Sequence, residues 1–146
     1  MATRSAILMH DGHHRNYRSI YCHWDGHPAY NGMILLEHYT NPDKVAELIS
    51  LGSLSSLGPE IGEKHDFDQR DENVCTFYGR DRGEEDVGAE LFATLEEAFE
   101  FCSHAGCEFL YVFHPNDYED WACYSAHDRE YINLYKIREE METENA

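Results

Sequence analysis

Basic residues are missing from a long part of this chain. The 146 residues include 29 acidic side chains and 11 lysines and arginines, which gives a formal net charge of −18. Residues 83–128 contain twelve acidic residues and no Lys or Arg, whereas residues 1–82 contain eight basic and twelve acidic residues. Such a chain repels nucleic acids and anionic membranes, because both are bound mainly through Lys and Arg. It attracts basic proteins, and proteins that handle nucleic acids are typical examples. The alternative is that the charge serves general solubility or adaptation to a salty environment.

Long apolar runs and paired cysteines are also absent. No apolar stretch approaches the roughly 18 residues that cross a bilayer, and the opening MATRSAILMHDGHH has no apolar segment of signal-peptide length. The cysteines are odd in number and form no C-x-x-C, which indicates free, mostly buried thiols in a reducing compartment. We therefore expect a cytoplasmic protein. The cysteines are Cys22, Cys75, Cys102, Cys107 and Cys123.

Motifs of catalysis are absent as well. The chain has no Walker-type loop, no G-x-G-x-x-G, no G-x-S-x-G and no H-E-x-x-H. Cys22 and His23 are neighbours on a predicted strand, so their side chains point to opposite faces. Cys102 and His104 face different sides of a predicted helix. We expect no enzyme activity and no cofactor.

Histidines are frequent near the N-terminus, but their spacing does not favour a metal site. His13 and His14 lie in a predicted turn, and His23 and His27 lie at the opposite end of the strand that follows. At about 3.3 Å per residue, the two groups are roughly 20 Å apart or more. We expect no native metal site, although His23, Asp25 and His27 remain open as a minor ligand or proton site.

Turn residues and hydrophobic periodicity predict one α+β domain over residues 1–146. We expect a mainly antiparallel sheet, built from two hairpins and a short strand, with the helices packed on one face. Thr94 and Glu97 form a capping box, Trp24 is expected in the core, and the acidic end from about 139 is expected to fray. The expected elements are strands at 3–10 and 17–24, helices at 31–40 and 41–52, a polar connection at 53–73, a strand at 74–79, a helix at 94–105, a hairpin within 107–126 and a final helix capped by Asp128.

The segment FYGRDRGEED, residues 77–86, has two interpretations. In the first, Arg80 and Arg82 belong to a charged turn and pair with nearby carboxylates. In the second, they recognise an anion, because an arginine fork binds phosphate or carboxylate through two hydrogen bonds. The second interpretation suggests a binding site for a small nucleotide. Its candidate residues are Arg80, Arg82, Tyr21, Trp24 and Tyr78, with Arg4 as a further member.

The acidic residues after position 83 form the main candidate binding surface. Ordinary solvated helix faces mix charges of both signs, but this part of the sequence supplies no base to pair with its acids. An array of one sign resembles a nucleic-acid backbone and steers association with a basic partner. Aromatic side chains such as Tyr118 or Trp121 are candidate anchors. The expected partner-binding residues are Glu84, Glu85, Asp86, Glu90, Glu96, Glu97, Glu100, Asp117, Glu119 and Asp120.

Several short motifs together resemble a known family. The opening ATRS, then IYCHWDGHP, LGSLSSLG and TFYGRDRGEE, are similar to those of small, functionally uncharacterised proteins encoded by phages and prophages. The resemblance covers roughly residues 1–100. It implies an accessory phage protein, and acidic proteins of that class often block host defences by occupying the nucleic-acid site of a nuclease complex. No catalytic residue is carried over.

The functional hypothesis that follows has a leading form and two alternatives. The leading form is a phage-encoded, non-enzymatic inhibitor of a host CRISPR effector or restriction enzyme, acting in the cytoplasm of the infected bacterium. It would bind the host protein, not nucleic acid or membrane, and an oligomer is compatible with it. The alternatives are a protein that sequesters a nucleotide second messenger and a phage housekeeping or virion component.

Overall fold

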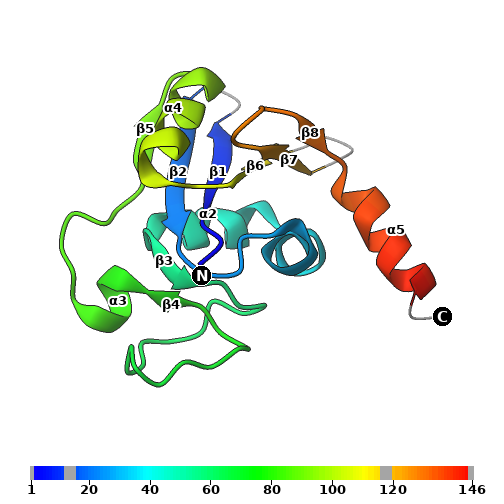
Figure 1. The fold of residues 1–146 in the computed structure, drawn as a ribbon. Helices are drawn as coiled ribbons and strands as arrows, with labels where there is room; N and C mark the ends of the chain where they lie inside the picture. Colours follow the sequence, from blue (N-terminus) through cyan, green and yellow to red (C-terminus); the bar gives the residue numbers. More distant parts are fainter. Residues whose placement is uncertain (1, 12–15, 116–119, 145–146) are drawn as a thin grey trace.

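An eight-stranded mixed sheet forms the centre of the structure (Figure 1), a computed structural model that describes residues 2–11, 16–115 and 120–144. The strand order is β4-β3-β2-β1-β6-β7-β8, and β5 pairs with β2 beside this path. The strands are β1 (Ser5–Asp11), β2 (Asn16–Cys22), β3 (Leu54–Ser56), β4 (Thr76–Phe77), β5 (Glu90–Phe92), β6 (Phe109–Phe113), β7 (Trp121–Ser125) and β8 (Tyr131–Ile132).

The two expected hairpins are present, but two of the strand pairs are parallel. β1 and β2 pair antiparallel from Ser5 opposite Cys22 to Asp11 opposite Asn16, and β6 pairs antiparallel with β7. β6 runs parallel to β1, and β3 meets β2 in parallel at one position. Parallel neighbours need a long crossover, which the helix-containing segments of this chain supply. The sheet is therefore mixed.

Helices cover both faces of the sheet, so the prediction of one covered face is wrong. Along β1, Ile7 and Met9 join the core under α1 and α2, whereas Ala6 and Leu8 pack with α4 on the other side. The sequence SAILM is a continuous buried run, which is typical of a strand enclosed on both faces. The described helices are η1, a π-helix (Pro28–Gly32), and α1 (Met33–His38), α2 (Pro42–Ser50), α3 (Tyr78–Arg82), α4 (Leu95–Ala105) and α5 (Leu134–Glu144).

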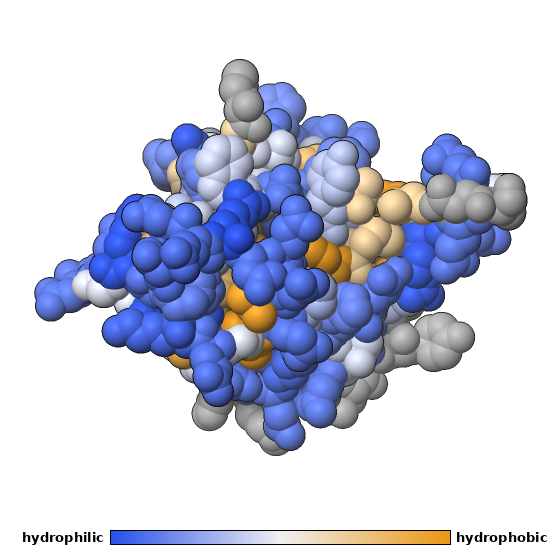
Figure 2. All heavy atoms as spheres, turned by 90° about the horizontal axis from the view of Figure 1, so that it is seen from below, coloured by the Kyte–Doolittle hydropathy of each residue, from blue (hydrophilic) through white to orange (hydrophobic). Residues whose placement is uncertain are grey.

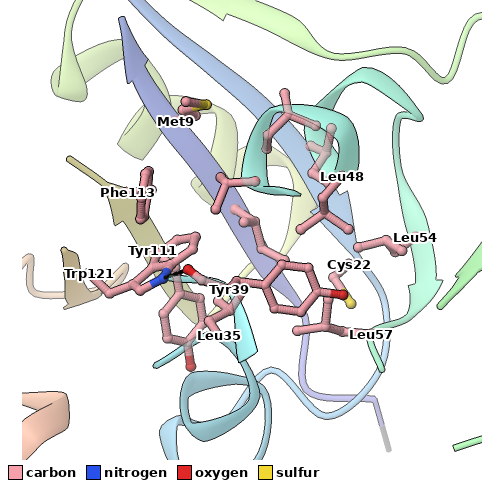
Figure 3. Packing of buried hydrophobic residues seen from close by; sticks show 14 of the residues in the cluster. Met9, Cys22, Leu35, Tyr39, Leu48, Leu54, Leu57, Tyr111, Phe113 and Trp121 are labelled. Atoms are coloured by element: carbon pink, nitrogen blue, oxygen red, sulfur yellow. Dashed lines mark hydrogen bonds between the residues drawn. The ribbon is translucent and has the colours of Figure 1, made fainter. Parts of the chain in front are cut away.

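Large aromatic side chains in the main core donate hydrogen bonds to backbone carbonyls, and Figure 3 shows one of these bonds, from Trp121 to Tyr39. The Trp121 indole donates to the carbonyl oxygen of Tyr39 over 2.8 Å, and the Tyr39 hydroxyl donates to that of Gly58 over 2.7 Å. The Tyr111 hydroxyl donates to the carbonyl oxygen of Gly26 over 2.6 Å. Each ring thus buries its apolar body while its polar tip keeps a hydrogen bond. These bonds tie loops to the sheet.

The run IYCHWDGHP forms a corner after β2. Asp25 has a φ of 59°, and the Gly26 N–H donates to the carbonyl of Thr3 over 2.8 Å. A Cβ on Gly26 would lie 2.8 Å from that same oxygen, so only glycine fits there. His27 caps η1, because its Nδ1 accepts from the Ala29 N–H over 3.0 Å. Trp24 is only partly buried and lies outside both core clusters, contrary to expectation.

Short elements account for most of the remaining differences from the prediction. The connection 53–73 contains β3, and the expected strand at 74–79 is only β4 before α3 begins at Tyr78. β8 precedes the last helix, so α5 begins at Leu134 and Asp128 is not its cap. The Asp128 carboxylate instead accepts from the Glu130 N–H over 3.1 Å.

In the described ranges, no helix has the length and apolar character needed to cross a membrane.

Candidate functional site

A hollow of about 420 Å³ lies on the surface beside β2. It is bounded by the end of β2, by α3, by the segment that runs from α3 up to β5 along the left of Figure 1, and by α4. Acidic and aromatic side chains dominate its lining, and we call it the acidic hollow. Its lining includes Ser19, Tyr21, His23, Tyr78, Arg82, Glu84, Asp86 and Glu90.

Ser53 holds the walls of the acidic hollow together. Its N–H donates to the carbonyl of Val87 over 2.8 Å, and its carbonyl accepts from the Tyr78 N–H over 3.2 Å. Its hydroxyl accepts from the Tyr21 N–H over 3.1 Å. Gly52 has a φ of 89°, and its lack of a side chain allows the backbone of Val87 to approach closely. An added Cβ would lie 2.5 Å from the Val87 carbonyl oxygen. The hollow is therefore fixed by backbone contacts between distant segments.

The floor of the hollow carries a tyrosine and a histidine in direct contact. The Tyr21 hydroxyl and His23 Nδ1 lie 2.7 Å apart. Burial raises the pKa of Tyr21 to about 12, so this phenol stays neutral. Burial, with a smaller effect of the Arg4 guanidinium, lowers the pKa of His23 below its ordinary value. Beside them Ser19 is 3% exposed, and its hydroxyl has no hydrogen-bond partner among the described residues.

Arg82 is already paired within the hollow. Its Nη2 and Nε lie 2.7 and 3.2 Å from the same oxygen of Glu84. Its guanidinium also lies over the rings of Phe67 and Tyr78, at 4.4 and 4.9 Å from their centroids. The charged-turn interpretation therefore holds for Arg82. An anion entering here would compete with Glu84 for the guanidinium.

Two carboxylates of the hollow have no such partner. Asp86 and Glu90 are exposed, and neither forms an ion pair with any residue that the structure describes. Glu85, beside them, is exposed and likewise unpaired within the described ranges. Asp86 has a φ of 60°, a left-handed conformation that Asp tolerates better than most residues. With Arg82 neutralised by Glu84, the hollow carries a net negative charge.

Arg80 does not line the hollow, although the ligand hypothesis placed it there. Its guanidinium donates to the carbonyls of Ile61, Gly62 and Cys75 at 3.1, 2.9 and 2.9 Å. It also pairs with Asp81 at 3.0 Å, and the Asp81 side chain is fully buried. These bonds fasten the connection 58–75, which joins β3 to β4, to α3. Arg80 thus has a structural role, as the charged-turn interpretation expected.

Trp24 and Arg4 also lie apart from the lining of the acidic hollow. The Trp24 ring packs edge-on against the His23 ring and has the Arg70 guanidinium 6.0 Å from its centroid, but it does not line the hollow. Arg4 donates to the carbonyl of Ala105 at the end of α4, over 3.3 Å. Of the six residues proposed for a nucleotide site, the structure brings Tyr21, Tyr78 and Arg82 together.

The acidic residues of α4 differ from one another in their surroundings. The Thr94 hydroxyl accepts from the Glu97 N–H, as the predicted capping box requires, whereas the Glu97 carboxylate accepts from the N–H of Ala93, one residue before the cap, over 2.7 Å. Glu96 pairs with Arg129, the first base after the base-free stretch. Glu100 is exposed and has no ion pair among the described residues. The acids from Glu84 to Glu100 are therefore partly neutralised, and those of α4 do not line the acidic hollow.

The remaining expected acidic residues precede β7 in the sequence. Asp117 and Glu119, with Tyr118, fall outside the described residues. Asp120 is partly buried, and its carbonyl accepts from the His114 N–H over 2.8 Å. Trp121 is buried in the core at 1% exposure, so it is not a surface anchor.

Neither a metal site nor a reactive thiol is found among the described residues. Across the ranges that the structure describes, no group of three or more His, Cys, Asp or Glu side chains is arranged to hold a metal ion. All five cysteines are buried and unpaired. Burial raises the pKa of Cys22 and of Cys123 to about 12, which keeps these thiols protonated and weakly nucleophilic.

Sequence reasoning did not single out Ser19, Ser53 or the Tyr21–His23 contact as parts of a binding site. Ser53 gives no local signal, because its function depends on Tyr21, Tyr78 and Val87, which are distant in the sequence. Alternation along β2 does place Tyr21 and His23 on one face, and that pattern is a usable signal.

Comparison with known proteins adds no relative: no protein-family model, no curated protein and no solved structure matches this chain.

Proposed function

We propose that this chain is a non-enzymatic, acidic inhibitor that binds a basic, nucleic-acid-handling protein. The observation that carries the proposal is the acidic hollow, where Asp86 and Glu90 lie unpaired beside Glu85. Unpaired carboxylates on a fixed frame attract Lys and Arg side chains and suppress binding of anions. The surface is thus suited to a protein that normally holds nucleic acid with those same bases.

The aromatic walls of the hollow suit a cationic side chain. Aromatic faces attract cations, and the Arg82 guanidinium already lies over the Tyr78 ring at 4.9 Å. Tyr21 and His23 offer a neutral hydroxyl and an imidazole at the floor. A partner's arginine entering here would meet Asp86 and Glu90 at the rim.

The biological setting of the proposal comes from the phage-like motifs. With the net charge of −18, they favour a CRISPR effector or a restriction enzyme of a bacterial host as the partner, in the host cytoplasm. The inhibitor would occupy the partner's nucleic-acid site without chemistry of its own.

A second candidate function is supported by one observation. Tyr21, Tyr78 and Arg82 line the same hollow, so a small nucleotide would find two rings and one guanidinium there. The bond between Arg82 and Glu84, and the free carboxylates around it, make this candidate the weaker one. Thermal-shift measurements with cyclic nucleotides test it: stabilisation at micromolar concentrations would favour the nucleotide over the basic protein.

The experiment for the leading proposal is a pull-down from a lysate of the bacterial host at moderate salt, with proteins identified by mass spectrometry. Each retained protein is then purified and tested for nucleic-acid binding with and without this chain. We expect the chain to displace the nucleic acid, with an affinity that falls as salt is raised. Retention of no nucleic-acid-binding protein, or retention without displacement, would contradict the proposal.

A further inference from the structure

A second hollow, of about 780 Å³, lies between η1 and α1 on one side and residues 56–59 and 70–73 on the other. It shares no lining residue with the acidic hollow. Its size is in the range of pockets that hold small ligands. The corner IYCHWDGHP leads directly into it, since Asp25 and the residues of η1 form one wall.

Apolar side chains form part of the lining of the second hollow, beside polar and charged ones. Met33 and Leu57 line it at 8% and 7% exposure, together with the partly buried Ile34 and Pro59. Figure 2 views the molecule from below and shows apolar surface in the middle of that face, surrounded by hydrophilic residues. Tyr30, 62% exposed, adds an aromatic ring at the edge of the hollow. A ligand with a hydrocarbon or aromatic body gains from burial against these side chains.

A buried acceptor without a partner lies in the same wall. The Asn31 amide nitrogen donates to the carbonyl of Trp24 over 2.9 Å, which orients the side chain. Asn31 is 1% exposed, and its Oδ1 has no hydrogen-bond partner among the described residues. A buried acceptor left unsatisfied is costly, so a ligand donor that reached Oδ1 through a small shift of this wall would be stabilised.

The rim of the second hollow is negative. Glu37, Asp71 and Glu72 line it, and none of them forms an ion pair within the described ranges. The one arginine in the lining, Arg70, is paired with Asp25 at 3.3 Å. The rim therefore favours a ligand with a positive charge.

Hydrogen bonds from Lys44 and Tyr39 hold the two sides of the second hollow together. Lys44 donates to the carbonyl of His38 over 2.9 Å and to that of Pro59 over 2.7 Å, so it links the two sides. The Tyr39 hydroxyl donates to the carbonyl of Gly58 over 2.7 Å. Binding to a pre-formed hollow costs less conformational entropy than binding to a mobile one.

We propose that the second hollow binds a small organic cation, a protonated amine carried on an aromatic or aliphatic body. The body packs against Met33, Ile34 and Leu57. The ammonium group donates to the rim carboxylates, and the Tyr30 ring contributes its face to the cation.

Three probes with the same phenol frame test this proposal: tyramine, which is cationic; para-ethylphenol, which is neutral; and phloretic acid, which is anionic. Each is titrated into the full chain at neutral pH while the NMR signals of the Ile34 and Met33 methyl groups are followed. We expect saturable shifts with tyramine and at least about fivefold weaker binding of the other two, as expected for loss of charge pairing.

Two double variants separate local from overall charge. Glu37→Gln with Glu72→Gln removes two charges from the rim, and Glu47→Gln with Glu142→Gln removes two exposed charges elsewhere. We expect the first pair to weaken tyramine binding about fivefold and the second to leave it nearly unchanged. The proposal is overturned if tyramine does not shift the two methyl groups, if a neutral or anionic probe binds as well, or if both double variants behave alike.

Discussion

The indole N–H of Trp121, on β7, donates to the backbone carbonyl of Tyr39, which ends α1, over 2.8 Å (Figure 3). The hydroxyl of the same Tyr39 continues to the carbonyl of Gly58. One line of buried hydrogen bonds therefore runs from the sheet, through the end of a helix, to the connection that walls the second hollow. The stability of the fold and the shape of that hollow depend on the same residues.

Replacing Trp121 by phenylalanine removes the donor but keeps an aromatic ring. The Tyr39 carbonyl is then buried without a partner, and we expect a loss of about 1 to 3 kcal/mol in the free energy of unfolding. Urea denaturation followed by circular dichroism measures it. Trp24→Phe is the control, because the partly buried Trp24 lends its backbone carbonyl, not its ring, to Asn31. An equal effect of both variants would contradict this assignment.

Asp81→Asn is expected to destabilise the chain by about 3 kcal/mol, because it leaves Arg80 without its buried partner. Asp81 also accepts from the N–H groups of Phe77 and His65 at 2.8 and 3.0 Å. Burial alone would raise the pKa of Asp81, but these hydrogen bonds and that from Arg80 outweigh it and lower the pKa. Urea midpoints report the change, and the exposed Asp68→Asn is expected to have almost no effect.

The lowered pKa of Asp81 fixes the direction of its pH dependence. Its stabilising contribution is complete above the ordinary carboxyl value of 3.8 and is lost as the pH falls through the lower value of the folded state. The wild-type chain should therefore lose stability in that acid range more steeply than Asp81→Asn. Identical pH profiles would show that Asp81 is not held as a carboxylate by Arg80.

His23 is expected to titrate below its ordinary value of 6.5, because burial and then Arg4 lower its pKa. Its neutral form is therefore favoured in the folded state, and stability falls as the pH drops below 6.5. NMR titration of the imidazole protons measures the midpoint. Arg4→Ala should raise this midpoint, and Lys64→Ala, an exposed base in the connection 58–75, should not. A midpoint above 6.5 in the wild type would contradict the structure of the hollow's floor.

The cysteine thiols should react slowly in the folded chain. All five are buried, and burial raises the pKa of Cys22 and Cys123 to about 12. Cys102 differs, because a hydrogen bond from Cys107 lowers its pKa. We expect a thiol-specific colour reagent to modify five thiols only after denaturation, and Cys102 first when the chain opens partly. Rapid modification of any thiol under native conditions would be the opposite result.

Elements with local signals could be predicted from the sequence. The antiparallel pairing of β1 with β2 was predicted from turn residues close in the sequence, of which 12–15 lie outside the described residues. The box of Thr94 and Glu97 before α4 likewise depends on neighbours within a few residues. β3, β5 and β8 have two or three residues each and exist because other strands pair with them. The parallel pairing of β1 with β6 joins residues about a hundred positions apart, which no local pattern reveals.

Some side chains of the candidate site were predictable from the sequence, but the backbone contacts that position them were not. Charge and aromatic content singled out Glu84, Asp86, Glu90, Tyr21 and Tyr78, and the structure brings these five together. Whether an arginine is free or already bound is a three-dimensional property. Sequence patterns therefore could not tell that Arg80 is held by backbone carbonyls while Arg82 stays at the hollow.

The proposed function requires that the acidic hollow, and not net charge alone, recognises a basic partner. The most direct test is a quantitative pull-down from host lysate with three baits: the wild type, a hollow variant (Glu85→Gln, Asp86→Asn, Glu90→Gln) and a charge-matched α5 variant (Glu139→Gln, Glu140→Gln, Glu142→Gln). At about 0.5 kcal/mol for each lost ion pair, we predict about tenfold less retained nucleic-acid-binding protein for the hollow variant and little change for the α5 variant. Equal losses for both variants, or no loss for the hollow variant, would contradict the account.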